Sequence, residues 1–480
     1  MNVSPINNPR SLLLRVMPGS ALSVRSYPSD AVKMLISAAC VALLAAASCT
    51  APSPAHTPSP QAPANEPSAA AAPPLKRRSV KPTISADGRY VVFQSSARAI
   101  VPDDTNDAED IFLSDTETVE MARVSVDSHG RQADGDSYDA VISANGRFVA
   151  FVSDAANLVP GDTNGHEDVF VRDLRDAATI RVSIGAGGRE GDGSSRSPAI
   201  AADGGVIAFA SVAGNLVADD TNNSGDVFVH DRKSGLTTRV SVALDGSEAA
   251  AGSGEPAISD DGRYVAFYSH AANLVPDDTN KRADVFLFDR TDNSIQRVSV
   301  SSEGKESDHD SRRPSISADG RFVAFESWAS NLVPGDTNAS ADIFVRDVRN
   351  ASTVRASVSS ALAEGNAESR APDISADGRH VVFTSYADNL TEGDTNRHAD
   401  VFIHDLRSGS TTRVSVDSHG GAGNNHSAEA RVNADGGFVV FASKAGNLVP
   451  DDTNKSVDVL LRDLRRLKTA DVTGALTRHR

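Results

Sequence analysis

The feature of this sequence that most constrains its fold is a repeat of 58 residues. A turn dipeptide recurs seven times at this spacing without drift. Its copies are Asp87-Gly88, Asn145-Gly146, Asp203-Gly204, Asp261-Gly262, Asp319-Gly320, Asp377-Gly378 and Asp435-Gly436. Seven such units account for nearly all of the chain from about residue 75 to residue 473. We therefore expect one repeat domain, although 480 residues would otherwise suggest two or three domains.

Each unit has the pattern of four short strands. In the fifth unit we expect strands over residues 314–317, 322–327, 342–347 and 353–358. Asp319-Gly320 forms the tight turn between the first two, because this dipeptide adopts positive φ at little cost. The second strand, Phe-Val-Ala-Phe, is apolar at successive positions, as expected of a strand covered on both faces. The pattern predicts an all-β fold, a seven-bladed β-propeller of four-stranded antiparallel blades.

Closure of the ring has two possible solutions. The terminal units lack the polar caps that an open solenoid needs, which favours a closed ring. Residues 468–473 supply a degenerate fourth strand for the last unit. Residues 75–80 resemble a fourth strand placed ahead of the first unit. Either segment can complete the seventh blade.

The repeat also carries a family resemblance. Pro-x-Ile-Ser-Ala-Asp-Gly-Arg-x-Val-Ala-Phe-x-Ser, followed by Asp-Ile-Phe-Val-x-Asp, resembles the TolB-like, WD-type propeller repeat of bacterial envelope proteins. Individual units depart from it: Asn145 replaces the turn aspartate, and Gly205 and Gly437 replace the turn arginine. The resemblance implies the propeller fold. It does not extend to the separate N-terminal domain of TolB, so we carry over no TolB-specific partner.

The N-terminal segment has the features of an export signal. Residues 34–47 form an uncharged run that is too short to span a bilayer, and basic residues precede it. The run ends in Ala-Ala-Ser-Cys, which resembles the lipobox of bacterial lipoproteins and implies that Cys49 is acylated and becomes the mature N-terminus. The alternative is an ordinary secretory signal. We expect a protein exported and lipid-anchored to a bacterial membrane, facing the periplasm or the cell exterior.

These observations divide the chain into four parts. Residues 1–48 are the signal peptide, and residues 49–74 are a Pro/Ala-rich tether that cannot bury a core. Residues 75–473 are the propeller, and residues 474–480 are a C-terminal tail. We expect a monomer that meets the membrane only through its lipid.

Between its second and third strands every unit carries Asp-Thr-Asn-x-x-x-Asp. Closely spaced oxygen ligands followed by a carboxylate suit a hard cation such as calcium. The candidate ligands are Asp104, Asn106, Asp110, Asp162, Asn164, Asp168, Asp220, Asn222, Asp226, Asp278, Asn280, Asp284, Asp336, Asn338, Asp342, Asp394, Asn396, Asp400, Asp452, Asn454 and Asp458. The structural alternative is an Asx-turn, with the later aspartate accepting backbone N–H groups.

The charge of the chain bears on the choice between a calcium site and a structural turn, and on the kind of partner that the protein binds. The formal net charge is -17, which repels phosphate backbones and argues against nucleic acid as a partner. Two aspartates in each of seven motifs give 14 carboxylates, and several acids in one loop repel each other unless a positive group pairs with them. This favours a cation in the loops.

The expected function is binding rather than catalysis. The sequence contains no nucleophile elbow, zinc-binding His-Glu-x-x-His or Gly-rich phosphate loop. The cluster over residues 308–313 suits a solvated loop, and the scattered histidines are expected mostly at the surface. The two long connections of each blade should share one face, which we expect to bind an envelope protein or polysaccharide. The alternative is a hydrolase or lyase acting on a polysaccharide, which requires His, Arg and Glu from adjacent blades in one cleft.

Overall fold

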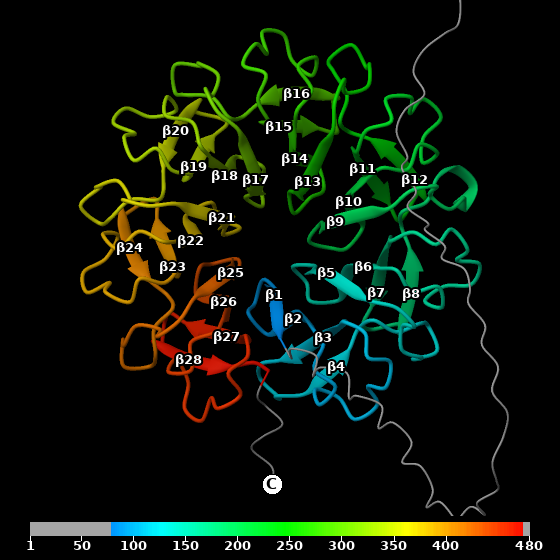
Figure 1. Cartoon of the computed structure of the whole chain (residues 1–480). Coiled ribbons are helices and arrows are strands. Elements are labelled where there is room, and N and C mark those ends of the chain that lie inside the picture. The colour runs from blue at the N-terminus through cyan, green and yellow to red at the C-terminus, as the bar shows by residue number, and fades with distance from the viewer. Residues whose placement is uncertain (1–77, 474–480) are drawn as a thin grey trace, which may run out of the picture. The chain divides into compact units, whose positions relative to one another are not determined.

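The protein is a seven-bladed β-propeller, seen down its axis in Figure 1. The computed structural model describes residues 78–473. The expected signal peptide, the tether and Cys49 lie outside these residues, as does the tail over 474–480. Within the described part, no helix has the length and hydropathy needed to cross a membrane.

Each blade is a four-stranded antiparallel sheet whose strands follow one another in the chain. The first strands, which line the axis, are β1 (Ser79–Ile84), β5 (Ser137–Ile142), β9 (Ser195–Ile200), β13 (Ser253–Ile258), β17 (Ser311–Ile316), β21 (Ser369–Ile374) and β25 (Ser427–Val432). The second strands are β2 (Tyr90–Ser95), β6 (Phe148–Ser153), β10 (Val206–Ser211), β14 (Tyr264–Ser269), β18 (Phe322–Ser327), β22 (His380–Ser385) and β26 (Phe438–Ser443).

The third strands each begin and end with aspartate: β3 (Asp110–Asp115), β7 (Asp168–Asp173), β11 (Asp226–Asp231), β15 (Asp284–Asp289), β19 (Asp342–Asp347), β23 (Asp400–Asp405) and β27 (Asp458–Asp463). The outer strands are β4 (Met121–Arg123), β8 (Ala178–Arg181), β12 (Leu236–Arg239), β16 (Ser294–Arg297), β20 (Ser352–Arg355), β24 (Ser410–Arg413) and β28 (Lys468–Asp471). The fold class predicted from the repeat is confirmed.

Two strand boundaries differ by three residues from those expected in the fifth unit, and two more differ by one residue. The first strand begins at Ser311 rather than at residue 314, because a β-bulge lets the chain pair on both sides of Arg313, whose φ is +51°. The bulge recurs in every first strand. The outer strand ends at Arg355 rather than at residue 358, because Val358 forms a separate bridge with Glu364.

The core consists of apolar layers between blades. The second and third strands are buried along most of their length, as expected when neighbouring blades cover both faces. Phe325 of β18 and Phe344 of β19 are fully buried and pack with residues of the preceding blade, including Val285 and Leu287. The continuous apolar run of each second strand is therefore explained by burial on both faces.

The ring closes without exchange of strands. β28 is the fourth strand of blade seven, so residues 468–471 complete this blade. Of the alternative segment, residues 75–80, Ser79 and Val80 belong instead to β1 of blade one. Ser79 donates its N–H to Val457 O at 2.9 Å, the contact that Ser137 N–H makes with Glu109 O between blades one and two. Blade seven thus meets blade one through the same contact as the other blades.

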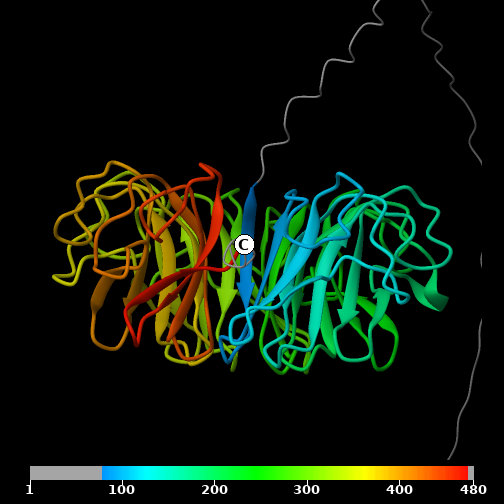
Figure 2. The same cartoon turned by 90° about the horizontal axis from the view of Figure 1, so that it is seen from below.

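The two faces of the disc carry different connections (Figure 2). On one face the first tight turn of each blade bonds the turn between the third and outer strands, as Arg321 does with Asp347 at 2.6 Å. On the other face the long connections bond each other, as Asn338 Nδ2 does with Gly365 O at 2.8 Å. We call this second surface the loop-rich face.

Candidate functional site

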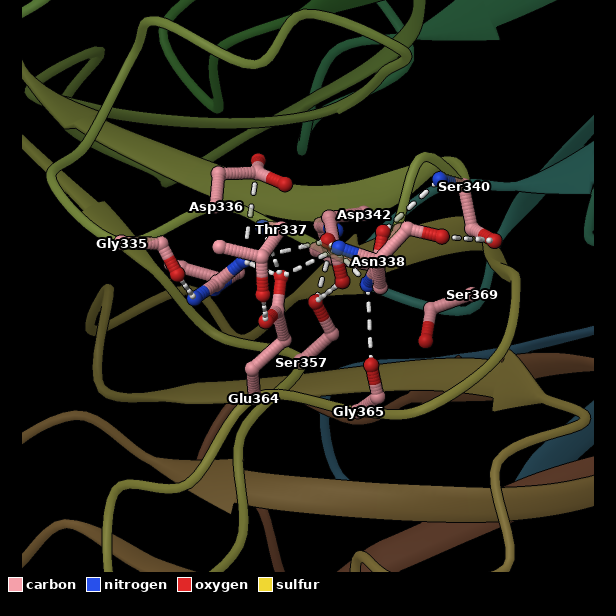
Figure 3. Close-up of polar contacts among 12 residues, drawn as sticks. Gly335, Asp336, Thr337, Asn338, Ser340, Asp342, Ser357, Glu364, Gly365 and Ser369 are labelled. Carbon is pink, nitrogen blue, oxygen red and sulfur yellow. Dashed lines mark hydrogen bonds and ion pairs between the residues drawn. The ribbon is translucent and has the colours of Figure 1, made fainter.

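The Asp-Thr-Asn motif of blade five forms a compact polar cluster on the loop-rich face (Figure 3). Asp336 lies in the connection between β18 and β19, and Asp342 is the first residue of β19. Glu364 comes from the connection that follows β20. Its carboxylate accepts hydrogen bonds from the Thr337 N–H at 2.8 Å and the Thr337 hydroxyl at 2.7 Å. The motif is therefore fastened to the next long loop of the same blade.

The asparagine of the motif acts as a turn residue. Asn338 Oδ1 accepts the N–H of Ser340 at 2.7 Å, which is an Asx-turn, and its Nδ2 donates to Asp342 Oδ2 at 2.9 Å. The same turn forms in all seven blades, at Asn106, Asn164, Asn222, Asn280, Asn338, Asn396 and Asn454. An amide that turns its nitrogen toward the carboxylate does not present oxygen to a cation there.

An arginine that the motif does not contain lies against its carboxylates. Arg355, the last residue of β20, places Nη1 3.6 Å from Asp336, 3.3 Å from Asp342 and 2.8 Å from Glu364. Its side chain is 8% exposed. The guanidinium thus supplies positive charge to three carboxylates in a mostly buried place.

Equivalent arginines occupy this position in blades one to six: Arg123, Arg181, Arg239, Arg297, Arg355 and Arg413. Sequence reasoning missed them because they lie on the outer strand, outside the loop motif. Their 58-residue spacing was the available signal. The glutamate also varies: Gln132 replaces it in blade one and Ala422 in blade six.

Burial and hydrogen bonding shift the pKa values of the aspartate and the glutamate at this position of the blades in opposite directions. Burial, together with the neighbouring Asp342, raises the pKa of Asp336 to about 6, against the influence of Arg355. In blade two, hydrogen bonds from the Thr163 N–H and hydroxyl lower the pKa of Glu190 to about 2. Burial therefore disfavours the charged form of the aspartate, whereas hydrogen-bond donors favour the charged form of the glutamate.

The predicted ligands are brought together within each blade. Among the described residues, Asp336, Asp342 and Glu364 have carboxylate oxygens close enough to share one metal ion. Arg355 contacts these same carboxylates, so a metal ion would compete with its guanidinium. A role for the motif residues as metal ligands, Asp336 and Asp342 included, stays a prediction.

A second feature of the loop-rich face breaks the sevenfold symmetry. The residue after each second strand is Val212, His270, Trp328 and Tyr386 in blades three to six, and all four are exposed. Trp328, the single tryptophan of the chain, is 38% exposed, and Tyr386 is 50% exposed. Blades one, two and seven carry Ser96, Asp154 and Lys444 there. We call the set Val212, His270, Trp328 and Tyr386 the aromatic arc.

The arc is held by main-chain bonds to the preceding loop. Trp328 N–H donates to Asp310 O at 3.1 Å, and Tyr386 N–H donates to Glu368 O at 2.9 Å. The Tyr386 ring also packs edge-on against His426, with centroids 6.0 Å apart. Fixed backbone with exposed side chains is the arrangement of a preformed contact surface.

The histidine-containing segment over 308–313 and the scattered histidines have different surroundings. The side chain of His309 is about half exposed, and its Nδ1 lies 3.4 Å from the carboxylate of the adjacent Asp308, as expected of a solvated loop. The expectation of surface positions is wrong for His230 and His404, which are buried on third strands. There they bond Thr237 and Thr411, and burial lowers the pKa of each.

One hollow of about 540 Å³ on this face does gather histidine, arginine and glutamate. Its lining includes His166, Arg189 and Glu190, with Asn215 from the next blade. Glu190 is already bonded to Thr163 and Arg181. The hollow thus holds the three residue types expected in a hydrolase or lyase cleft, but His166, Arg189 and Glu190 all come from loops of blade two.

The comparisons with known proteins concern the fold. No family model matches the chain, and no curated protein matches it. Solved structures do match. The propeller domain of the Trilobed protease from Pyrococcus furiosus is 11% identical, with a TM-score of 0.51 over 82% of this chain and 97% of that one. The acylaminoacyl peptidase of Pyrococcus horikoshii is 10% identical, with a TM-score of 0.50 over 84% of this chain and 53% of that one.

A TolB structure, from Acinetobacter baumannii, is also among the matches. It is 16% identical with a TM-score of 0.39, and the match covers 80% of both chains. At these identities the two matches with TM-scores of 0.50 and 0.51 show the fold alone, a β-propeller. None of these matches establishes an activity of this chain.

Proposed function

We propose that this protein is a membrane-tethered scaffold of the bacterial cell envelope that binds a protein or polysaccharide partner through its loop-rich face. The aromatic arc carries this proposal. Exposed tryptophan and tyrosine are enriched where proteins bind partners, because they bury large area at little entropic cost. Two adjacent blades present Trp328 and Tyr386 at one structural position and the two blades before them present Val212 and His270, whereas the remaining three blades present small or charged side chains there.

The stiffness of this face supports binding. Within blade five the long loops are joined by Thr337 and Glu364, and between blades Asp308 N–H donates to Asn331 Oδ1 at 3.1 Å. These bonds tie one loop to the next around the face. Because these loops are already ordered, binding a partner costs little further conformational entropy, which favours affinity.

Electrostatics support a partner that is basic or bridged by cations. The chain carries a net charge of -17, and exposed acids such as Asp103, Asp219, Asp277 and Asp451 lie in the long loops. Such a field steers positive partners and weakens with added salt. Calcium held by loop carboxylates would fit the same chemistry, since carboxylate oxygens are the ligands that calcium prefers.

Location at a membrane is part of the proposal. The Ala-Ala-Ser-Cys sequence ending at Cys49 supports lipid attachment, and the Pro/Ala-rich segment after it supports a spacer between membrane and propeller. The alternative function, a polysaccharide hydrolase or lyase, draws its support from the hollow that contains His166, Arg189 and Glu190. Glu190 is engaged with Thr163 and Arg181, which weighs against a catalytic role.

The test is capture of envelope proteins and glycans by the purified protein. We expect Trp328→Ala with Tyr386→Ala to abolish capture of the wild-type partner without lowering the melting temperature by more than about 2 °C, since both side chains are exposed. Leu236→Ala is the matched control: it removes a side chain that is 61% exposed at the outer strand of blade three, away from the arc. Equal capture by the double variant, or turnover of a glycan or peptide that is lost on mutating His166 or His309, overturns the proposal.

A further inference from the structure

The first strands of the seven blades surround an axial channel (Figure 1). The channel holds two hollows whose walls overlap, one of about 420 Å³ that includes Lys81 and one of about 320 Å³ that extends to Ala86. Thr83 and Arg431 line both hollows, and no residue of the aromatic arc lines either one. Hollows of this size are typical of sites for small organic molecules. The channel is therefore a candidate ligand site that is distinct from the arc.

The β-bulge of each first strand places one side chain in this channel. The bulged position recurs every 58 residues from Lys81 to Glu429, its φ lies between +49° and +56° in every copy, and every copy lines the larger hollow. None of the seven residues is glycine, although glycine adopts this conformation at the least cost. Bulges occur often beside functional sites, where they redirect a side chain. The blades thus keep side chains in the channel at the cost of backbone strain.

The charged side chains at the bulged position already have partners. Lys81 forms an ion pair with Asp139, and Arg313 forms one with Glu326 at 3.2 Å. Glu429 accepts the N–H of Lys81 at 2.8 Å, and the equivalent glutamate of blade four accepts that of Arg313 at 3.2 Å. Any free binding group must therefore lie at another level of the channel.

Two donors at the next level of the channel are left without such partners. The Thr83 side chain lies in a residue that is 8% exposed, and its hydroxyl has no hydrogen-bond partner among the described residues. Arg431 forms no ion pair within residues 78–473, and its Nη1 donates to Ala430 O at 3.0 Å. Thr83 pairs with Val92 and Arg431 with Val440, the same place on adjacent blades. A free hydroxyl and a free guanidinium suit a carboxylate, which accepts strong hydrogen bonds from both.

Asp373 of blade six brings a negative charge to the same level. Its carboxylate accepts the Ser315 hydroxyl at 3.1 Å and the Val432 N–H at 2.9 Å. Burial raises the pKa of Asp373, and the positive charge of Arg431 opposes this shift. The two charges therefore act on each other, although they form no ion pair among the described residues.

The wall across the channel from these groups is apolar. At the same level, blades two, three and four carry Val141, Ala199 and Ala257, which line the smaller hollow. A ligand with a single charge fits these surroundings poorly, because an anion at Arg431 would lie near Asp373 and a cation at Asp373 would lie near Arg431. A molecule with both charges and an apolar body meets complementary groups on each side.

We propose that the axial channel binds a free α-amino acid with an apolar side chain. The carboxylate of the ligand accepts hydrogen bonds from Arg431 and Thr83, its ammonium group donates to Asp373, and its side chain packs against the apolar wall. Thr83 and Arg431 belong to blades one and seven, so the site is complete only in the closed ring. The inference does not rest on the proposed function, because the channel site and the aromatic arc share no residue.

The test is calorimetric titration of the full chain with alanine, valine and leucine, each compared with two analogues. The corresponding amine lacks the carboxylate, and the corresponding deaminated acid lacks the ammonium group. We expect at least one of the amino acids to bind at one site per chain. Both of its analogues should bind at least about tenfold more weakly, because each loses charge-assisted hydrogen bonds.

Variants assign the groups of the site. Arg431→Met should weaken binding at least about tenfold, and Thr83→Val, which removes the hydroxyl at nearly constant volume, at least about threefold. Asp373→Asn should weaken binding of the amino acid but strengthen binding of the deaminated acid, because it removes a negative charge beside Arg431. Arg349→Met, at an exposed position outside the channel, is the control and should bind as the wild type does.

Three results would overturn the inference. These are no binding of any of the three amino acids at millimolar concentration, equal affinity for an amino acid and its amine, or unchanged affinity in Arg431→Met. If that variant does not fold, as judged by its melting curve, unchanged affinity in Thr83→Val overturns the inference in its place.

Discussion

The phenyl ring of Phe325 on β18 lies against that of Phe344 on β19, with the ring centroids 6.0 Å apart. Equivalent pairs occur in blades one to six. Blade seven places Phe441 opposite Leu460 instead. We expect Phe325→Ala to lower the free energy of unfolding by about 3–5 kcal/mol, because it leaves a cavity between two blades. Phe344→Leu copies blade seven and should cost about 1 kcal/mol. Urea denaturation measures both.

Arg355→Met should be among the most destabilising single changes on the loop-rich face. It leaves Asp336 and Asp342 without the charge that faces them, and removing one partner of a buried ion pair costs about 3–5 kcal/mol. Arg349→Met, at an exposed position on the opposite face, is the control and should change the free energy of unfolding by less than about 0.5 kcal/mol. Equal unfolding midpoints for the two variants would contradict the role given to Arg355.

Two glycines with the same backbone conformation should respond differently to alanine. Gly320 has φ +70°, and an added Cβ would strike the Tyr264 ring of the neighbouring blade, whereas Gly335 has φ +76° and faces open space. Gly335→Ala should cost about 1 kcal/mol, from backbone strain alone. Gly320→Ala should cost about 2–5 kcal/mol, because overpacking adds to that strain. Thermal melts of the two variants give the comparison, and a smaller shift for Gly320→Ala would contradict the interblade contact.

Acid should destabilise the face of tight turns. The hydrogen bond from Arg89 lowers the pKa of Asp115 from 3.8 to about 2. Because the folded pKa lies below the unfolded one, this stabilisation is present above about pH 4 and is lost as the pH falls toward 2. Melting temperatures between pH 5 and pH 2 should therefore fall less steeply in Arg89→Ala than in the wild type. Arg407→Ala, at an exposed position, should follow the wild-type curve.

The mature chain should begin at an acylated Cys49. Mass spectrometry of the membrane fraction should find an N-terminal peptide that starts at this cysteine and carries lipid, because the apolar run before it ends in a lipobox-like sequence. Cys49→Ser should move the protein out of that fraction. A soluble wild-type product that begins downstream of residue 49 would contradict lipid anchoring.

The sequence predicted the fold well because the repeat itself encodes it. The seven turn dipeptides, of which Asp319-Gly320 is the template, set the unit length, and the apolar second strand required cover on both faces. The choice between residues 468–473 and residues 75–80 could not be made, because both have a strand-like pattern and only packing against β27 decides between them.

The site was harder to predict because its charge balance depends on another strand. Asp336, Asn338 and Asp342 were recognisable as a motif, but Arg355 reaches them across the blade and belongs to a run that looks like ordinary strand. The aromatic arc was also missed. Trp328 has no distinctive local sequence context. Its exposure is given by the structure, and its significance comes from the exposed Tyr386 at the same place in the next blade.

The contact between Ser79 and Val457 has a consequence for how the ring assembles. Every blade draws its four strands from consecutive residues, so six blade interfaces join segments that are neighbours in the chain. Only the seventh joins residues from opposite ends, and its loop-closure entropy is the largest. Folding can therefore proceed blade by blade as an open arc with an apolar flank at each end. This partly folded open ring is the species most prone to misassembly. Folding of blade seven against blade one then buries both apolar flanks in a single step.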